Sequence, residues 1–128
     1  MPTPPTARSI IADRRRLLTA LAVVLGITEL ADAFVISFWE GAVAFGILFL
    51  AGASWTRRGG IGGPILIGAL CAFEIQAFFQ WQRGGAADWA VQIAFLIVSG
   101  IGLITTVAVL KSAYHARAAK QPMARAGA

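Results

Sequence analysis

Charged side chains are scarce in this sequence and are missing from long parts of it. Only 13% of the 128 residues are Asp, Glu, Lys or Arg, whereas 58% are hydrophobic. No lysine, arginine or histidine lies within any of the long apolar runs. Soluble domains carry about twice this proportion of charged residues. The composition therefore excludes an ordinary soluble domain and indicates an integral membrane protein.

Cysteine and histidine are almost absent as well. Cys71 is the single cysteine, so the chain forms no internal disulfide, and its apolar surroundings are typical of a small core residue. His115 is the single histidine and lies outside the apolar runs. Ser99 and Cys71 therefore have no base within these runs to activate them as nucleophiles. We expect no enzymatic activity, no cofactor and no resident metal ion.

Four apolar runs predict an all-α, polytopic membrane protein with four transmembrane helices arranged as two similar hairpins. The runs cover residues 17–39, 41–55, 65–81 and 89–110. The second run is short and spans a bilayer only if the helix also includes Glu40 and Thr56, if the bilayer is thinner there, or if neighbouring helices shield its ends. The predicted units are a basic arm (1–16), a first hairpin (17–56), a basic loop (57–64), a second hairpin (65–110) and a basic tail (111–128).

The distribution of basic residues predicts the orientation in the membrane. Lysines and arginines gather in the arm, the 57–64 loop and the tail, while the two other turns are nearly neutral. By the positive-inside rule both termini are cytoplasmic, in the plasma or inner membrane of the cell. Trp39, Trp81 and Trp89 then mark the outer interface, and Trp55 marks the inner one. Because basic clusters beside spans serve topology, we expect no nucleic-acid binding.

The arm and the first run also share features with an export signal, because three arginines precede an apolar segment. Glu29, and the apolar sequence that continues to Trp39, favour a retained helix instead. The arm itself is expected to be flexible or to lie on the membrane surface.

An internal repeat supports the two-hairpin arrangement. Shifting the sequence by 42 residues superposes a glycine, an acid and a tryptophan: Gly26, Asp32 and Trp39 on Gly68, Glu74 and Trp81. The pattern indicates two hairpins of the same orientation, related by a two-fold axis along the membrane normal. The alternative is coincidence, since glycine and aromatic residues are common in membrane helices. If the repeat is real, Asp32 and Glu74 face a common axis at equivalent depth.

Three carboxylates, Glu29, Asp32 and Glu74, lie within the apolar runs. Each is displaced slightly from the middle of its helix toward the outer surface of the membrane. A carboxylate at the centre of a membrane helix costs about 2.5–3.5 kcal/mol. The absence of basic residues from the runs excludes an ion pair within the chain. These acids therefore hold protons or meet a cation that comes from elsewhere. Glu40 and Asp88, by contrast, are expected to be solvated charges at helix ends.

Four further polar residues suggest a path that leads from the acids through the bundle. Gln92, Ser99 and Thr106 recur at intervals of seven and so share one helical face, and Gln76 lies close to Glu74 in sequence. Their hydrogen-bonding groups would extend a polar path from the carboxylates.

These features support two functions that the sequence leaves open. The first is proton-linked transport or conduction of a small cation, with Glu29, Asp32 and Glu74 as the proton- or cation-binding residues. The alternative is a non-catalytic accessory or assembly subunit, whose acids pair with a basic residue of a partner subunit. A bundle this small encloses little space, so we expect a homodimer or a larger membrane complex within the lipid bilayer.

Overall fold

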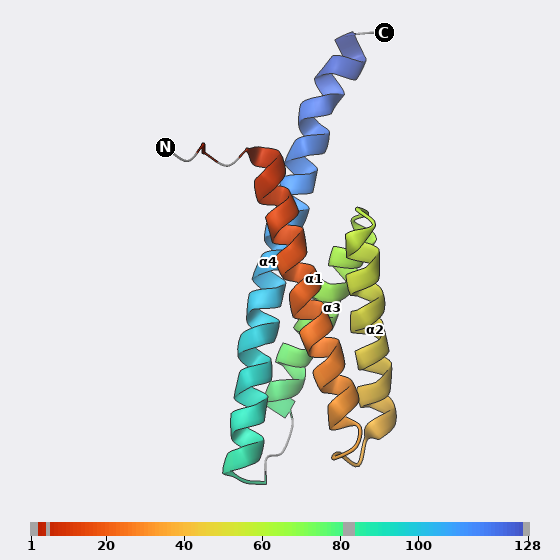
Figure 1. Cartoon of the computed structure of the whole chain (residues 1–128), viewed down its shortest axis with the longest axis vertical. Helices are drawn as coiled ribbons and strands as arrows, with labels where there is room; N and C mark the ends of the chain where they lie inside the picture. The colour runs from red at the N-terminus through yellow and green to blue at the C-terminus, as the bar shows by residue number, and fades with distance from the viewer. Residues whose placement is uncertain (1–2, 5, 81–83, 127–128) are drawn as a thin grey trace.

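The computed structural model describes residues 3–4, 6–80 and 84–126, with the side chains of Ala7 and of residues 122–126 excepted. Within these residues the chain forms four helices and no strand, which confirms the predicted all-α fold. The helices are α1 (Ala7–Asp32), α2 (Trp39–Arg57), α3 (Gly62–Gln80) and α4 (Ala86–Ala126). They run alternately up and down (Figure 1). The end of the bundle at which α1 begins is called the termini end. The opposite end, at which α1 and α3 finish, is called the connection end.

Helix α1 differs from the predicted first span at both of its ends. It begins at Ala7 because the side chain of Thr6 caps it, accepting a hydrogen bond from the Ser9 N–H at 3.3 Å. Most of the predicted flexible arm therefore belongs to the helix. It ends at Asp32, so the apolar run to Trp39 is not one continuous helix, which is a correction. The Val35 N–H bonds the Asp32 carbonyl at 2.8 Å and turns the chain toward α2.

The other helices extend the predicted runs. Helix α2 includes both Glu40 and Thr56, as its short apolar run required. Helix α4 continues far beyond Leu110, so its last part projects past the termini end of the bundle (Figure 1). Alanine, lysine and arginine, which are strong helix formers, dominate this extension.

Trp39 and Trp89 lie at the connection end and Trp55 near the other end, whereas Trp81 lies outside the described residues.

Each helix packs against the helices next to it in the chain, and α4 closes the bundle by packing against α1. The closest packing lies within the α1–α2 and α3–α4 pairs, which are the predicted hairpins. In this cyclic order α1 and α3 face each other diagonally across the bundle axis. Side chains on their inner faces therefore point toward a common centre.

The inner face of α1 changes from apolar to acidic along its length. Leu18, Ala22 and Leu25 are buried in the core, and the same stripe continues with Glu29 and Asp32, at alternating spacings of four and three residues. The core therefore fills the half of the bundle nearest the termini end. At the connection end, the positions that would extend this core are occupied by carboxylates.

Helix α3 shows the same change. Ile67, Leu70 and Cys71 are buried in the core, and Glu74 follows on the same face. Both diagonal helices therefore direct an acid to the bundle axis beyond the core.

Helices α1 and α2 approach most closely where two glycines meet. A Cβ atom on Gly26 would lie 3.0 Å from the Gly46 carbonyl oxygen, and one on Gly46 would lie 2.9 Å from that of Gly26. Neither position has room for a side chain. Gly46 thus allows α2 to pack closely against α1.

Arginines of the predicted arm tie α1 to its neighbours at the termini end. The Arg15 guanidinium donates a hydrogen bond to the Gly60 carbonyl oxygen at 3.0 Å, in the α2–α3 loop. Arg14 donates to the Ser112 hydroxyl of α4, also at 3.0 Å. Gly59 allows this loop to turn because its φ of 93° lies in the left-handed region, which favours glycine.

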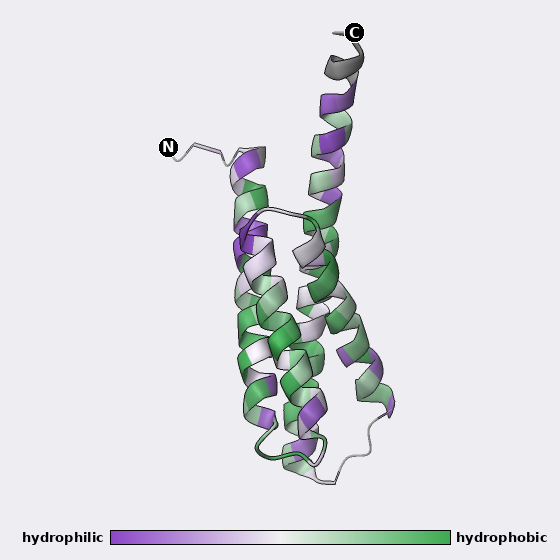
Figure 2. Cartoon of the chain, turned by 90° about the vertical axis from the view of Figure 1, so that its right-hand side faces the viewer, coloured by the Kyte–Doolittle hydropathy of each residue, from purple (hydrophilic) through white to green (hydrophobic). Residues whose placement is uncertain are grey.

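Two of the described helices are long and apolar enough to cross a membrane: α3, and α4 over Ala86–Gln121. Charged residues interrupt α1 in its first half and again near its end, and they lie at both ends of α2. Figure 2 shows hydrophobic residues along the middle of the bundle and hydrophilic ones on the projecting part of α4.

Candidate functional site

A cavity of about 530 Å³ lies at the connection end of the bundle, beyond the apolar core. All four helices contribute to its wall, together with the turn between α1 and α2. The cavity exists because acids and small residues occupy the inner positions there in place of large aliphatic side chains. Four carboxylates line it: Glu29, Asp32, Glu74 and Asp88.

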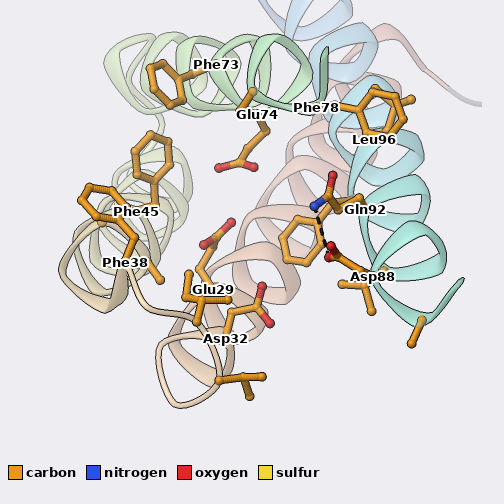
Figure 3. Close-up of a pocket in the computed structure, with 18 residues that line it drawn as sticks. Glu29, Asp32, Phe38, Phe45, Phe73, Glu74, Phe78, Asp88, Gln92 and Leu96 are labelled. Atoms are coloured by element: carbon orange, nitrogen blue, oxygen red, sulfur yellow. Dashed lines mark hydrogen bonds between the residues drawn. The ribbon is translucent and has the colours of Figure 1, made fainter. Parts of the chain in front are cut away.

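Glu29 is the most buried of these acids, with 7% of its surface exposed. Its carboxyl group points across the cavity toward that of Glu74, on the diagonally opposite helix (Figure 3). The two groups are close enough to interact directly. No basic side chain among the described residues pairs with Glu29, and its partner is the carboxyl group of Glu74. Two negative charges facing each other in a largely apolar wall repel, so this arrangement favours a shared proton or a bound cation.

Asp32 also lines the cavity, one turn nearer the connection end than Glu29. Its carboxyl group lies beside Glu29 and interacts electrostatically with Glu29, Glu74 and Asp88. Asp32 and Glu74 therefore share one cavity, and Glu29 is the acid whose carboxyl group directly faces Glu74.

Asp88 is a cavity residue that sequence reasoning assigned to solvent. The carboxylate accepts a hydrogen bond from the Gly84 N–H at 3.2 Å and another from Gln92 Nε2, also at 3.2 Å. It therefore caps the start of α4 and orients the amide of Gln92 on the cavity wall. The available signal was the spacing of Asp88 and Gln92, four residues apart and thus on one helical face.

Aromatic rings form much of the remaining wall. Five phenylalanines line the cavity: Phe38, Phe45, Phe73, Phe78 and Phe95. The rings of Phe45 on α2 and Phe73 on α3 have their centroids 5.0 Å apart. In Figure 3 these two rings and Phe38 stand on one side of the carboxyl groups, and Asp88 and Gln92 stand on the other. The cavity thus combines negative charge with aromatic surface.

The predicted polar path is only partly assembled. Gln92 lines the cavity, but Gln76 is exposed and lies away from it, which is a correction. Ser99 and Thr106 are buried on the inner face of α4, as their spacing predicted, and their hydroxyl oxygens have no hydrogen-bond partner. They lie in the closely packed part of the bundle, where a Cβ atom on Gly68 would be 2.6 Å from Thr106 Cγ2. They do not line the cavity.

The basic side chains that the structure describes lie far from these acids in the fold, and Arg83, five residues before Asp88 in the sequence, lies outside the described residues. Every lysine and arginine whose side chain the structure describes is at the termini end or on the projecting part of α4. In the described part of the chain, no three side chains of metal-binding type converge closely enough to hold a metal ion. The cavity therefore presents acids around an open space instead of a compact metal-coordination sphere.

Comparison of the chain with protein-family models, curated proteins and solved structures gives no match. The site is therefore interpreted from its own geometry and chemistry.

Proposed function

We propose that the chain is a four-span membrane protein that binds a proton or a small cation at Glu29 and Glu74 during transport or conduction. The observation that carries this proposal is the buried Glu29, whose carboxyl group faces Glu74 and has no basic partner among the described residues. Ionisable residues at such positions in membrane proteins generally mark ion or substrate pathways. Both termini are proposed to be cytoplasmic, in the cell's plasma or inner membrane.

The outer surface of the bundle supports four spans. Val24, Ile47, Ile65 and Ile104 lie on four different helices, and each is more than half exposed. A soluble bundle places polar residues on this outer face. Lipid is a favourable environment for such a surface, and so the proposal extends from α3 and α4 to α1 and α2.

The turn between α1 and α2 supports the same proposal. Phe34 is 92% exposed and Val35 is 83% exposed, although they belong to a connecting segment. Apolar residues of this size at a turn are favourable where the turn meets the membrane interface. The nearby cavity would then lie between the interface and the core of the bundle.

Flux into liposomes tests the transport role. The purified full-length chain is reconstituted, and proton and potassium fluxes are followed with a pH-sensitive dye and an ion electrode. We expect flux above that of empty liposomes, and a reduction of about tenfold or more in Glu29→Gln and Glu74→Gln, since each removes a charged ligand. Glu40→Gln is the matched control, because Glu40 is exposed and does not line the cavity. Unchanged flux in Glu29→Gln would overturn the proposal.

An accessory role is the second candidate, and the position of the half-buried Asp32 and Asp88 favours it. These acids lie near the mouth of the cavity, where a basic side chain of another subunit could reach them. In that case the chain leaves the membrane only together with other polypeptides, and Glu29→Gln lowers assembly without affecting flux. Purification of an isolated homodimer with acid-dependent flux would support transport instead.

A further inference from the structure

We propose that the cavity binds an organic ammonium cation with apolar substituents. This names the substrate class of the site and rests on the cation-binding function proposed above. Three features of the cavity support this proposal: its size, its aromatic wall and the buried Glu29, which faces Glu74 and has no basic partner among the described residues.

The size of the cavity indicates a molecule and not a bare ion. Its volume of about 530 Å³ lies within the range of roughly 300–1,000 Å³ that is typical of small-molecule sites. A bare metal ion instead needs several ligands at about 2.0–2.6 Å from one point. The carboxyl groups here stand around the space, and no three metal-binding side chains in the described part of the chain converge.

The wall selects for positive charge combined with apolar surface. Phenylalanine rings attract cations through their faces, most strongly where water is excluded, and Arg, Lys or quaternary ammonium groups all use this interaction. Phe45 and Phe73 stand side by side, with ring centroids 5.0 Å apart, on the side of the cavity opposite Gln92. Phenylalanine offers no hydrogen bond, so it favours a cation whose charge is surrounded by carbon over a strongly hydrated inorganic ion.

The acids provide the counter-charge. Glu29 is more than nine-tenths buried and points into the cavity, where it faces Glu74 and has no basic partner among the described residues. A monovalent ammonium group between Glu29 and Glu74 relieves the repulsion between the two carboxylates. Its substituents then lie against the phenylalanines, and the site accounts for both the charge and the apolar surface of one ligand.

Equilibrium dialysis of the purified full-length chain against radiolabelled phenyltrimethylammonium tests this inference. We expect saturable binding that Glu29→Gln weakens by about tenfold or more, and that Phe45→Leu weakens by about three- to tenfold, because leucine keeps the apolar bulk but not the ring. Glu40→Gln and Phe34→Leu are the matched controls, since neither residue lines the cavity. Circular dichroism confirms that each variant is folded.

Competition measurements show whether the cavity recognises the charge of the probe as well as its apolar surface. Unlabelled phenyltrimethylammonium should displace the probe, whereas its neutral isostere tert-butylbenzene and potassium ions should displace it at least about tenfold less effectively. Equal displacement by tert-butylbenzene, or unchanged binding in Glu29→Gln, would show that the cavity recognises apolar surface alone, and would overturn the inference.

The liposome experiment distinguishes the failure of this inference from the failure of the proposed function. Acid-dependent proton or potassium flux without binding of phenyltrimethylammonium overturns the organic-cation inference and leaves cation transport standing. The absence of both flux and binding overturns both proposals.

Discussion

Among single residues, Glu29 and Asp88 show how the same functional group takes different roles. Glu29 is buried and has no basic partner among the described residues, so its charge remains to be balanced by a proton or a ligand. Asp88 is half-buried and already accepts two hydrogen bonds, from Gly84 and Gln92. Asp88 therefore contributes to the structure of the cavity wall as well as to its charge.

Substitution of Asp88 separates these two contributions. Asp88→Ala should lower the free energy of unfolding by about 1–2 kcal/mol, because α4 loses both the capping hydrogen bond and a negative charge in its first turn. Asp88→Asn keeps an acceptor oxygen and should cost about half as much. Thermal unfolding in detergent, followed by circular dichroism, measures both effects. Unfolding of Asp88→Ala at the wild-type temperature would contradict the capping role.

At the scale of helices, the contact between Gly26 and Gly46 sets how α1 and α2 cross. Both backbones touch at this point, and a side chain on either glycine would meet the carbonyl oxygen of the other. The position of this crossing determines the axial position of Glu29 on α1 relative to the aromatic residues of α2. Between α3 and α4, Gly68 contacts a side chain instead, because a Cβ atom there would lie 2.6 Å from Thr106 Cγ2.

Two alanine substitutions test this contact. Gly46→Ala should destabilise the bundle by about 1–3 kcal/mol, because the added Cβ overlaps the Gly26 backbone and α1 has to shift. Gly100→Ala is the matched control, since a Cβ atom there meets nothing within 4 Å. It should leave stability unchanged or raise it by up to about 1 kcal/mol, through the higher helix propensity of alanine. Denaturation in detergent compares the two, and equal effects would contradict the crossing.

The whole molecule is electrically asymmetric. Apart from Asp13, its acidic residues lie in the half nearer the connection end, while the described basic side chains lie at the termini end and along the projection of α4. In the membrane topology proposed above, the positive-inside rule orients the termini end toward the cytoplasm. The cavity would then be nearer the outer surface.

Labelling of single cysteines tests this orientation. In a Cys71→Ala background, Thr3→Cys, Gly84→Cys and Lys120→Cys each introduce one exposed thiol. We expect a membrane-impermeant maleimide to modify only Gly84→Cys in intact cells, because the other two positions lie at the cytoplasmic end. All three should react after the membrane is permeabilised. Labelling of Thr3→Cys in intact cells would reverse or exclude the proposed topology.

The sequence alone determined the helical class, the number of helices and the presence of acids without basic neighbours. These follow from local properties: apolar runs of sufficient length, helical periodicity and the placement of charge. Periodicity also placed Gln92, Ser99 and Thr106 on one helical face. The end of α1 at Asp32 was not predictable in this way, because backbone hydrogen bonds in a turn, and not hydropathy, end this helix.

Only the tertiary structure decided which of these polar residues form the site. Periodicity shows which residues share a face, but the choice of the inward face and the axial alignment of helices depend on packing between distant segments. The Gly26–Gly46 contact and the diagonal placement of α1 and α3 brought Glu29 opposite Glu74. The same packing placed Asp88 on the cavity wall. Gln76, two residues from Glu74 and therefore on the other side of α3, lies outside the cavity.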